Sequence, residues 1–316
     1  MQVGGRVRVT AQLIDGMTDE HLWAQSYERD MSDILALQGD VARAIAGEVK
    51  VELTSGESKR LASSNAVDPR AYDLYMRGRY YWNRRTSPDL RRALKLYQQA
   101  VDIQPDWARG YSAIAETYIV MAGWGTLPVS EAYPRVREFA DKALKLDPNL
   151  GSAWACLAGT AENLDWNWDK AEKNYLKAIE LEPNNATAHQ WYADFLSTQG
   201  RFDEAIEQID LAQKLDPLAP IIGLTKAEIH FISGEVGRAI VECNRVVAMD
   251  STFLGVYLLL GDASRYAGRD DQAAEAYANY YEAIAPGAGE SIRRRFTNGG
   301  IDGVIRMVIG GTRQAS

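Results

Sequence analysis

The chain has 316 residues, of which 46% are hydrophobic and 25% are charged, a composition typical of a globular protein with a sizeable core. Its formal net charge of −8 argues against nucleic-acid binding, because contacts to phosphate need clustered lysine and arginine. The longest apolar run, residues 253–260, is far too short to span a membrane. These features predict a cytoplasmic protein that binds neither nucleic acid nor a membrane.

Polarity alternates along the start of the chain, as expected of strands with one buried face. Apolar side chains recur at every second position from Val7 to Leu13, and the same period resumes at Leu22 after a polar turn. This pattern predicts a β-hairpin over residues 5–28. The open edge of a hairpin is a template for pairing, so a homodimer formed through it is one hypothesis.

Residues 32–53 carry apolar side chains at spacings of three and four, which predicts an amphipathic helix. The next segment, residues 54–70, is polar and is interpreted as a linker. One hairpin and one helix bury too little surface to be stable alone. Residues 1–53 are therefore not expected to form a stable domain by themselves.

Residues 71–286 form a series of internal repeats. Each unit has two amphipathic helical patterns separated by a turn, as at Gly200, and a proline follows the second helix in four units. Those prolines, at 105, 148, 183 and 217, stand 43, 35 and 34 residues apart. Small residues recur where paired helices would pack closest: Gly78, Ala115, Ala158, Ala193, Ala227 and Gly261 in first helices, with Ala93, Ala171, Ala205, Ala239 and Ala273 in second helices.

The period, the small residues, the turn glycine and the proline together resemble the tetratricopeptide-repeat family. That resemblance implies a mainly α fold, a right-handed helical solenoid of about six repeats whose first helices line a concave groove. Two segments, 83–89 and 123–134, are expected to lengthen the turns of the first two repeats. Residues 287–316 predict two short helices divided at Gly299-Gly300, which cap the array or begin a further repeat.

The N-terminal region resembles the end of a TolB-like (FlgO-like) α/β domain that precedes such repeats in one bacterial regulatory family. The likeness lies in "GGRVRVTAQLIDG", "HLWAQSYERDMSDILALQGDVARAIA" and, further on, "DPRAYDLYMRGRYYWNRRT". In that family an adenylate-cyclase domain or a winged-helix DNA-binding domain often lies N-terminal to this region. The 316 residues contain neither domain.

The sequence carries no signature of catalysis. It lacks the glycine-rich phosphate-binding motifs, the HExxH zinc motif and the CxxC redox motif. Its three histidines lack ligand spacing, and its two cysteines, Cys156 and Cys243, are interpreted as buried reduced thiols. We therefore expect no catalytic residue, no cofactor and no metal.

The solenoid resemblance assigns one stripe of each first helix to the groove. A spaced row of carboxylates on that stripe favours a protein or peptide partner of basic or mixed charge. The alternative, that the stripe is only the polar surface every solenoid needs, stays open. The stripe comprises Tyr72, Tyr75, Arg79, Trp82, Arg109, Ser112, Glu116, Glu162, Gln190, Asp194, Glu228, Asp262 and Arg265.

Two tryptophans stand close together in the third repeat. Trp168 aligns with Phe202 at the start of a second helix and is expected in the core. Trp166 aligns with a turn glycine, but its repeat is one residue longer, so its backbone need not take the glycine conformation. We expect Trp166 to cover the turn against Trp124 in the loop of the preceding repeat.

The leading hypothesis is a non-enzymatic interaction or regulatory module of a larger bacterial signalling or transcription-regulating protein. It would bind a peptide or a partner domain in its groove. Two alternatives stay open: the regulatory portion of an adenylate cyclase whose catalytic domain lies outside this chain, and a stand-alone dimeric scaffold.

Overall fold

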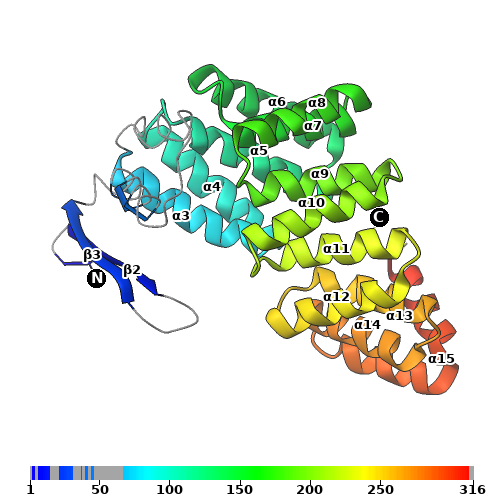
Figure 1. Ribbon diagram of the computed structural model, residues 1–316. Helices are drawn as coiled ribbons and strands as arrows, with labels where there is room; N and C mark the ends of the chain where they lie inside the picture. The colour runs from blue at the N-terminus through cyan, green and yellow to red at the C-terminus, as the bar shows by residue number, and fades with distance from the viewer. Residues whose placement is uncertain are drawn as a thin grey trace.

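The computed structural model describes residues 2–3, 6–14, 21–30, 37, 40–41, 44–45 and 67–312. Within these residues a small antiparallel sheet precedes thirteen helices (Figure 1). The helices stack side by side along the array, from α3 near the sheet to α15 at the far end. No helix among the described residues is both long and apolar enough to cross a bilayer.

The predicted hairpin is confirmed. Strands β2 (Arg6–Ile14) and β3 (His21–Asp30) pair antiparallel, and β1 (Gln2–Val3) adds to the other side of β2. Cross-strand pairs support the register, since Arg8 Nη2 donates to Glu28 Oε2 at 2.9 Å. Strand β3 is an outer strand of this sheet, so dimerisation through its edge stays a prediction.

The predicted helix over residues 32–53 lies mostly outside the described residues. Those that are described within it, 37, 40–41 and 44–45, are helical. The predicted linker 54–70 also lies largely outside them, and its last two residues belong to the first repeat. Helix α3 begins at Pro69, where the Asp68 carboxylate accepts the backbone N–H of Arg70 at 2.8 Å.

Six helix pairs follow, as the repeat pattern predicts. Within each pair the two helices pack antiparallel, and from α5 to α13 each first helix also packs on the first helix of the next repeat. The pairs are α3 (Pro69–Asn83) with α4 (Ser87–Ile103), α5 (Ala108–Gly123) with α6 (Val129–Leu146), α7 (Gly151–Asn163) with α8 (Trp168–Leu181), α9 (Ala186–Thr198) with α10 (Phe202–Leu215), α11 (Pro220–Ile232) with α12 (Val236–Met249), and α13 (Gly255–Tyr266) with α14 (Asp270–Ile284).

The small residues of the repeat pattern lie at the closest helix contacts. The four alanines predicted in first helices are fully buried. At the two ends of the array glycine takes their place, and a tyrosine ring of the second helix lies against it: Tyr97 on Gly78 and Tyr277 on Gly261. A side chain at either glycine would overlap the ring, so the sequence fixes how closely each pair can approach.

One of the two expected turn insertions is wrong, and the other is correct in part. The turn after α3 takes three residues, as in most later repeats, and the additional residues of 83–89 belong to the ends of α3 and α4. The turn between α5 and α6 is longer and takes five residues, 124–128, whereas the rest of 123–134, Pro134 included, is helical. Because helix α6 also has 18 residues where α8 has 14, the extra sequence of the second repeat lengthens both the turn and the helix after it.

The C-terminal segment is confirmed as two helical pieces. Helix α15 (Ala288–Thr312) is interrupted at Gly300, whose φ of 61° and ψ of −165° leave helical geometry. Its first piece packs on α14, where Ile292 is buried beside Tyr277. The segment therefore covers the apolar face of the sixth repeat.

Trp124 connects distant repeats. Its ring lies 5.9 Å from that of Phe253 at an interplanar angle of 70°, and it covers Gly255 at the start of α13. It packs against both large core clusters, one extending from α3 to α11 and the other from α11 to α14. The solenoid therefore curves until the turn of its second repeat contacts the start of its sixth.

The expectations for the two tryptophans of the third repeat are corrected. Trp166 does take the glycine conformation, with a φ of 54°, because Asn167 N–H bonds to Ala161 O at 2.8 Å and closes the turn. It is 71% exposed and lies edge-on to Trp168 at 6.0 Å, not against Trp124. Trp168 is 38% exposed rather than in the core.

Candidate functional site

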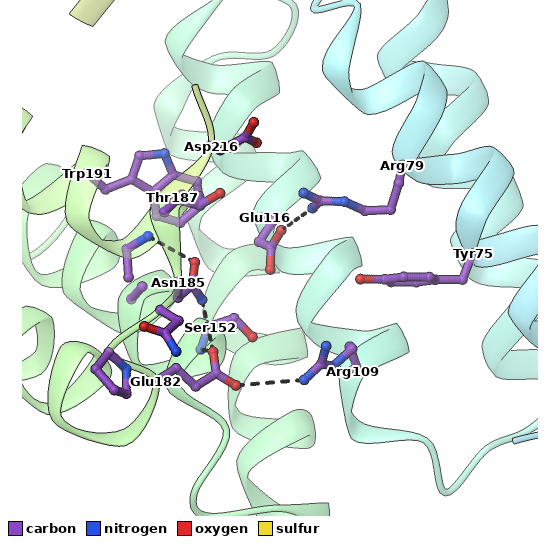
Figure 2. Close-up of a pocket in the computed structure, with 15 residues that line it drawn as sticks. Tyr75, Arg79, Arg109, Glu116, Ser152, Glu182, Asn185, Thr187, Trp191 and Asp216 are labelled. Carbon is purple, nitrogen blue, oxygen red and sulfur yellow. Dashed lines mark hydrogen bonds and ion pairs between the residues drawn. The ribbon is translucent and has the colours of Figure 1, made fainter. Parts of the chain in front are cut away.

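A cavity of about 460 Å³ opens on the concave side of the first four repeats (Figure 2). Its wall comes from the first helices α3, α5 and α7, and its far side from the segment between α8 and α9. Tyr75 directs its hydroxyl into this space. We call this cavity the concave pocket.

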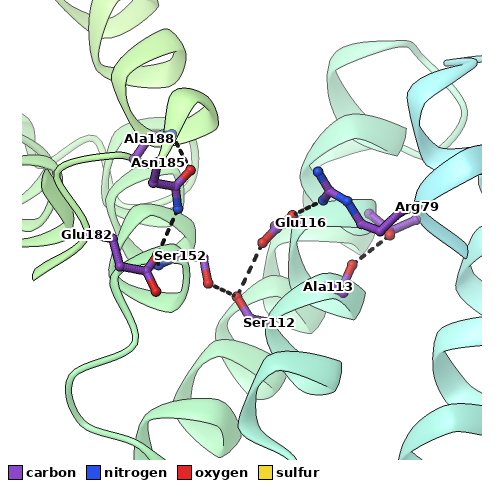
Figure 3. A network of polar contacts seen from close by, with 9 residues as sticks. Arg79, Ser112, Ala113, Glu116, Ser152, Glu182, Asn185 and Ala188 are labelled. Carbon is purple, nitrogen blue, oxygen red and sulfur yellow. Dashed lines mark hydrogen bonds and ion pairs between the residues drawn. The ribbon is translucent and has the colours of Figure 1, made fainter. Parts of the chain in front are cut away.

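An ion pair spans the near side of the concave pocket. Arg79 Nη1 donates to Glu116 Oε2 at 2.9 Å, and the other carboxylate oxygen accepts from Ser112 Oγ at 3.4 Å (Figure 3). Ser112 and Ser152 share a hydroxyl hydrogen bond of 2.8 Å, which joins α5 to α7. Burial has the largest single influence and works against the charged guanidinium, but Glu116 together with Tyr75 and Tyr97 raises the pKa of Arg79 overall.

The far side is built around Glu182. Its Oε2 accepts from the backbone N–H of Ser152 at 3.0 Å and from Asn185 Nδ2 at 2.9 Å, and Arg109 Nη2 lies 3.9 Å from Oε1. Asn185 in turn caps α9, since its Oδ1 accepts the N–H of Ala188 at 3.1 Å. These contacts fix the polar lining before any ligand arrives.

The structure divides the predicted stripe into three parts. Tyr75, Arg79, Arg109 and Glu116 line the concave pocket. Three predicted groove residues are in fact packed inside: Ser112 is 0% and Trp82 2% exposed, and Gln190 is buried with its amide donating to Thr225 Oγ1 at 3.0 Å. The others lie elsewhere on the first helices: Tyr72, Glu162, Asp194, Glu228, Asp262 and Arg265.

Three of those residues form an acidic wall on successive first helices, Glu162 on α7, Asp194 on α9 and Glu228 on α11. Burial together with the Asp194 charge raises the pKa of Glu228 to about 8 and that of Glu162 to about 7. Asp194 is accessible to water, yet the surrounding concave surface partly desolvates its carboxyl and raises its pKa as well. We call these three residues the acidic wall.

Sequence reasoning missed the far side of the pocket. Glu182, Asn185 and Trp191 line it, but the first two lie between helices, whereas the predicted stripe followed first helices alone. A signal was present in "ELEPNN", where an acidic residue and a helix-capping asparagine flank the repeat's proline. Among the described residues no group of three or more histidine, cysteine or carboxylate side chains could hold a metal ion.

Comparison with known proteins places the helices in a known fold. Residues 174–207 match the family model described as a tetratricopeptide repeat. The crystal structure of the anaphase-promoting complex heterotetramer Cut9-Hcn1 superposes with a TM-score of 0.53 over 80% of this chain and 46% of that chain, at 17% identity. At that identity the similarity shows the fold alone.

Two curated proteins are similar in sequence. "Putative adenylate cyclase 3" of Rhizobium meliloti is 38% identical over 117 residues, which cover 36% of this chain and 19% of that protein. The transcriptional regulator HilA of Salmonella typhimurium is 30% identical over 184 residues, which cover 58% of this chain and 33% of HilA. This chain thus spans a third or less of the length of each relative. Its described helices form a solenoid of the tetratricopeptide-repeat type, and residues 174–207 carry the sequence pattern of that family.

Proposed function

We propose that this chain is a non-enzymatic interaction module that binds a peptide or a segment of a partner protein on its concave side. The observation that carries the proposal is the acidic wall. Neither Asp194 nor Glu228 has a described lysine or arginine in its electrostatic environment, so the negative charge that each carries when ionised is not compensated within the described chain. A lysine or arginine from a partner would compensate it.

The concave pocket extends this preference to a mixed-charge segment. Its lining pairs two arginines, Arg79 and Arg109, with two glutamates, Glu116 and Glu182. The side chains of Arg79, Glu116 and Glu182 are already held by hydrogen bonds, so a bound segment would lose little further entropy of these side chains. The proteins of this repeat fold serve as interaction scaffolds, which agrees with the proposed role.

Neutralising the acidic wall should weaken capture of a basic peptide about tenfold or more. The experiment compares the original chain with the double variant Asp194→Asn, Glu228→Gln, which keeps side-chain shape. Binding of a fluorescein-labelled peptide of alternating lysine and alanine is measured by anisotropy at 150 mM salt and at pH 9, where Glu228 is ionised. An acidic peptide of equal length serves as the ligand control.

The matched control is Asp141→Asn with Glu207→Gln, which makes the same change in net charge at exposed sites on second helices. Equal affinities for both double variants would contradict the proposed site. In the original chain, affinity should rise between pH 6 and 9, because Glu162 and Glu228, both influenced by the Asp194 charge, are neutral below their pKa values of about 7 and 8 and charged above them. The Asp194→Asn, Glu228→Gln variant should lose the part of this rise that lies near pH 8, because that part comes from Glu228.

The curated relatives favour a larger regulatory context. We place the array in a bacterial regulator longer than this chain, with residues 1–53 as the end of a TolB-like domain. The second candidate, the regulatory portion of an adenylate cyclase, is favoured by the 38% identity to a protein of that name.

For both candidates the purified chain should form no cyclic AMP from ATP with Mg²⁺ or Mn²⁺. Product formation would contradict the non-enzymatic role.

A further inference from the structure

The first repeat places an arginine where other repeats place glycine. Arg85, in the turn between α3 and α4, has a φ of 55°. The glycines at the same place in later turns, Gly200, Gly234 and Gly268, also have positive φ angles, of 74°, 85° and 69°. This left-handed conformation is strained for a residue with a side chain. Because strain of this kind persists only where the surroundings impose it, the side chain of Arg85 needs an explanation.

That side chain is buried without hydrogen-bond partners. Arg85 is 4% exposed, and its guanidinium carbon lies 3.6 Å from the centre of the Trp82 ring. Its Nε and Nη2 have no acceptor among the described residues. These two N–H groups form the edge of the guanidinium that binds a carboxylate or phosphate with two parallel hydrogen bonds. The whole bidentate edge is therefore unoccupied by protein groups.

Two further buried donors of the same repeat lack acceptors. They are Trp82 Nε1 and the hydroxyl of Tyr97. The sixth repeat shows what is missing, because there the equivalent Tyr277 hydroxyl donates to Asp262 Oδ1 at 2.6 Å. The first repeat carries Arg79 at the position of Asp262, directly after the glycine under the tyrosine ring. It has thus exchanged an acceptor for another donor.

The charge of this cluster is also unbalanced. The carboxylate of Glu116 is already used by Arg79 at 2.9 Å and by Ser112 at 3.4 Å. Burial and the neighbouring Arg79 lower the pKa of Arg85 to about 9, which leaves its guanidinium protonated at neutral pH. A buried positive charge therefore stands beside donors that have no acceptor, a combination rare in folded proteins.

We propose that the first repeat binds a small oxyanion, a carboxylate or phosphate group, on the Nε–Nη2 edge of Arg85. One such group supplies both the negative charge and the acceptor oxygens that the cluster lacks. The ligand is small because Arg85 is sealed from solvent, and it enters by opening of the short turn 84–86. Arg85 does not line the concave pocket, so this site is separate from peptide capture.

The probes are sodium phosphate and sodium acetate, each titrated into the purified chain against sodium chloride at constant ionic strength. Two readouts are followed, the thermal unfolding midpoint and the NMR signals of the Arg85 Nε–H and Trp82 indole N–H groups. We expect one probe to raise the midpoint saturably and to shift both NMR signals. Saturation with phosphate identifies a phosphate group as the ligand, and saturation with acetate identifies a carboxylate.

The matched control uses a second arginine stacked on an aromatic ring. Arg92 is exposed and lies 4.5 Å from the centre of the Tyr81 ring. Arg92→Gln should keep the anion effect, and Arg85→Gln should remove it. If Arg85→Gln does not fold, the NMR titration of the unaltered chain tests the proposal, because it shows directly whether the anion shifts the Arg85 Nε–H signal. Absence of any saturable shift beyond that of chloride, with both probes, overturns the proposal.

Discussion

Replacing Gly261 with valine is expected to lower the free energy of unfolding by about 3 kcal/mol. A Cβ atom at this position would lie 2.5 Å from Tyr277 Cε1 and 2.8 Å from its Cδ1 and Cζ. Tyr277 cannot easily retreat, because it is 2% exposed and its hydroxyl is bonded to Asp262. Urea unfolding followed by circular dichroism measures the effect.

Gly237 provides the matched control for this substitution. It also lies in a helix, α12, but a Cβ atom there would meet nothing within 4 Å. Gly237→Val should therefore change stability by less than about 0.5 kcal/mol. An equal loss in the two variants would show that helix propensity, not the overlap with the tyrosine ring, explains the result at position 261.

Truncating Trp124 to alanine is expected to lower the free energy of unfolding by about 2–3 kcal/mol and to open the solenoid. The ring joins the two large core clusters and covers Gly255 and Phe253 in the sixth repeat. Without it, the contact that closes the curve is lost, and neighbouring repeats are free to spread. Urea unfolding measures the first effect, and the radius of gyration from small-angle X-ray scattering measures the second.

Trp166→Ala makes the same chemical change at a site with little packing. Trp166 is 71% exposed and its ring contacts Trp168 alone among the aromatic residues. We expect a change below about 0.5 kcal/mol and an unaltered radius of gyration. Trp124→Ala with unaltered scattering would contradict the role of Trp124 in closing the array.

The repeat pattern could be predicted because it depends on neighbours in sequence. The close contacts at alanine and glycine, and the turn at Gly200, involve residues of one helix pair only. The geometry of each repeat can therefore be predicted from the sequence of that repeat. The same reasoning placed Tyr75 and Arg79 on the concave side, where they line the pocket. The same reasoning was wrong for Trp82, which is 2% exposed. The predicted groove stripe is wide, and a residue at its edge faces the core instead of the groove.

The number of residues in a turn does not predict the backbone conformation of that turn. The longer third repeat suggested a relaxed backbone at Trp166, yet the hydrogen bond from Asn167 to Ala161 closes the turn in the left-handed conformation regardless. Arg85 takes the same conformation in the first repeat. Turn geometry follows the hydrogen bonds that end one helix and begin the next, and loop length alone does not determine them.

The sequence by itself determined the helix pairs, their number and their stacking order, because these follow from local periodicity and from small residues at fixed spacing. Only the tertiary structure decided which distant repeats meet. The concave pocket between the first and fourth repeats, the Trp124 contact with Phe253 and the unpaired edge of Arg85 all depend on how small rotations between repeats accumulate. That accumulation is a property of the whole array, and no single repeat encodes it.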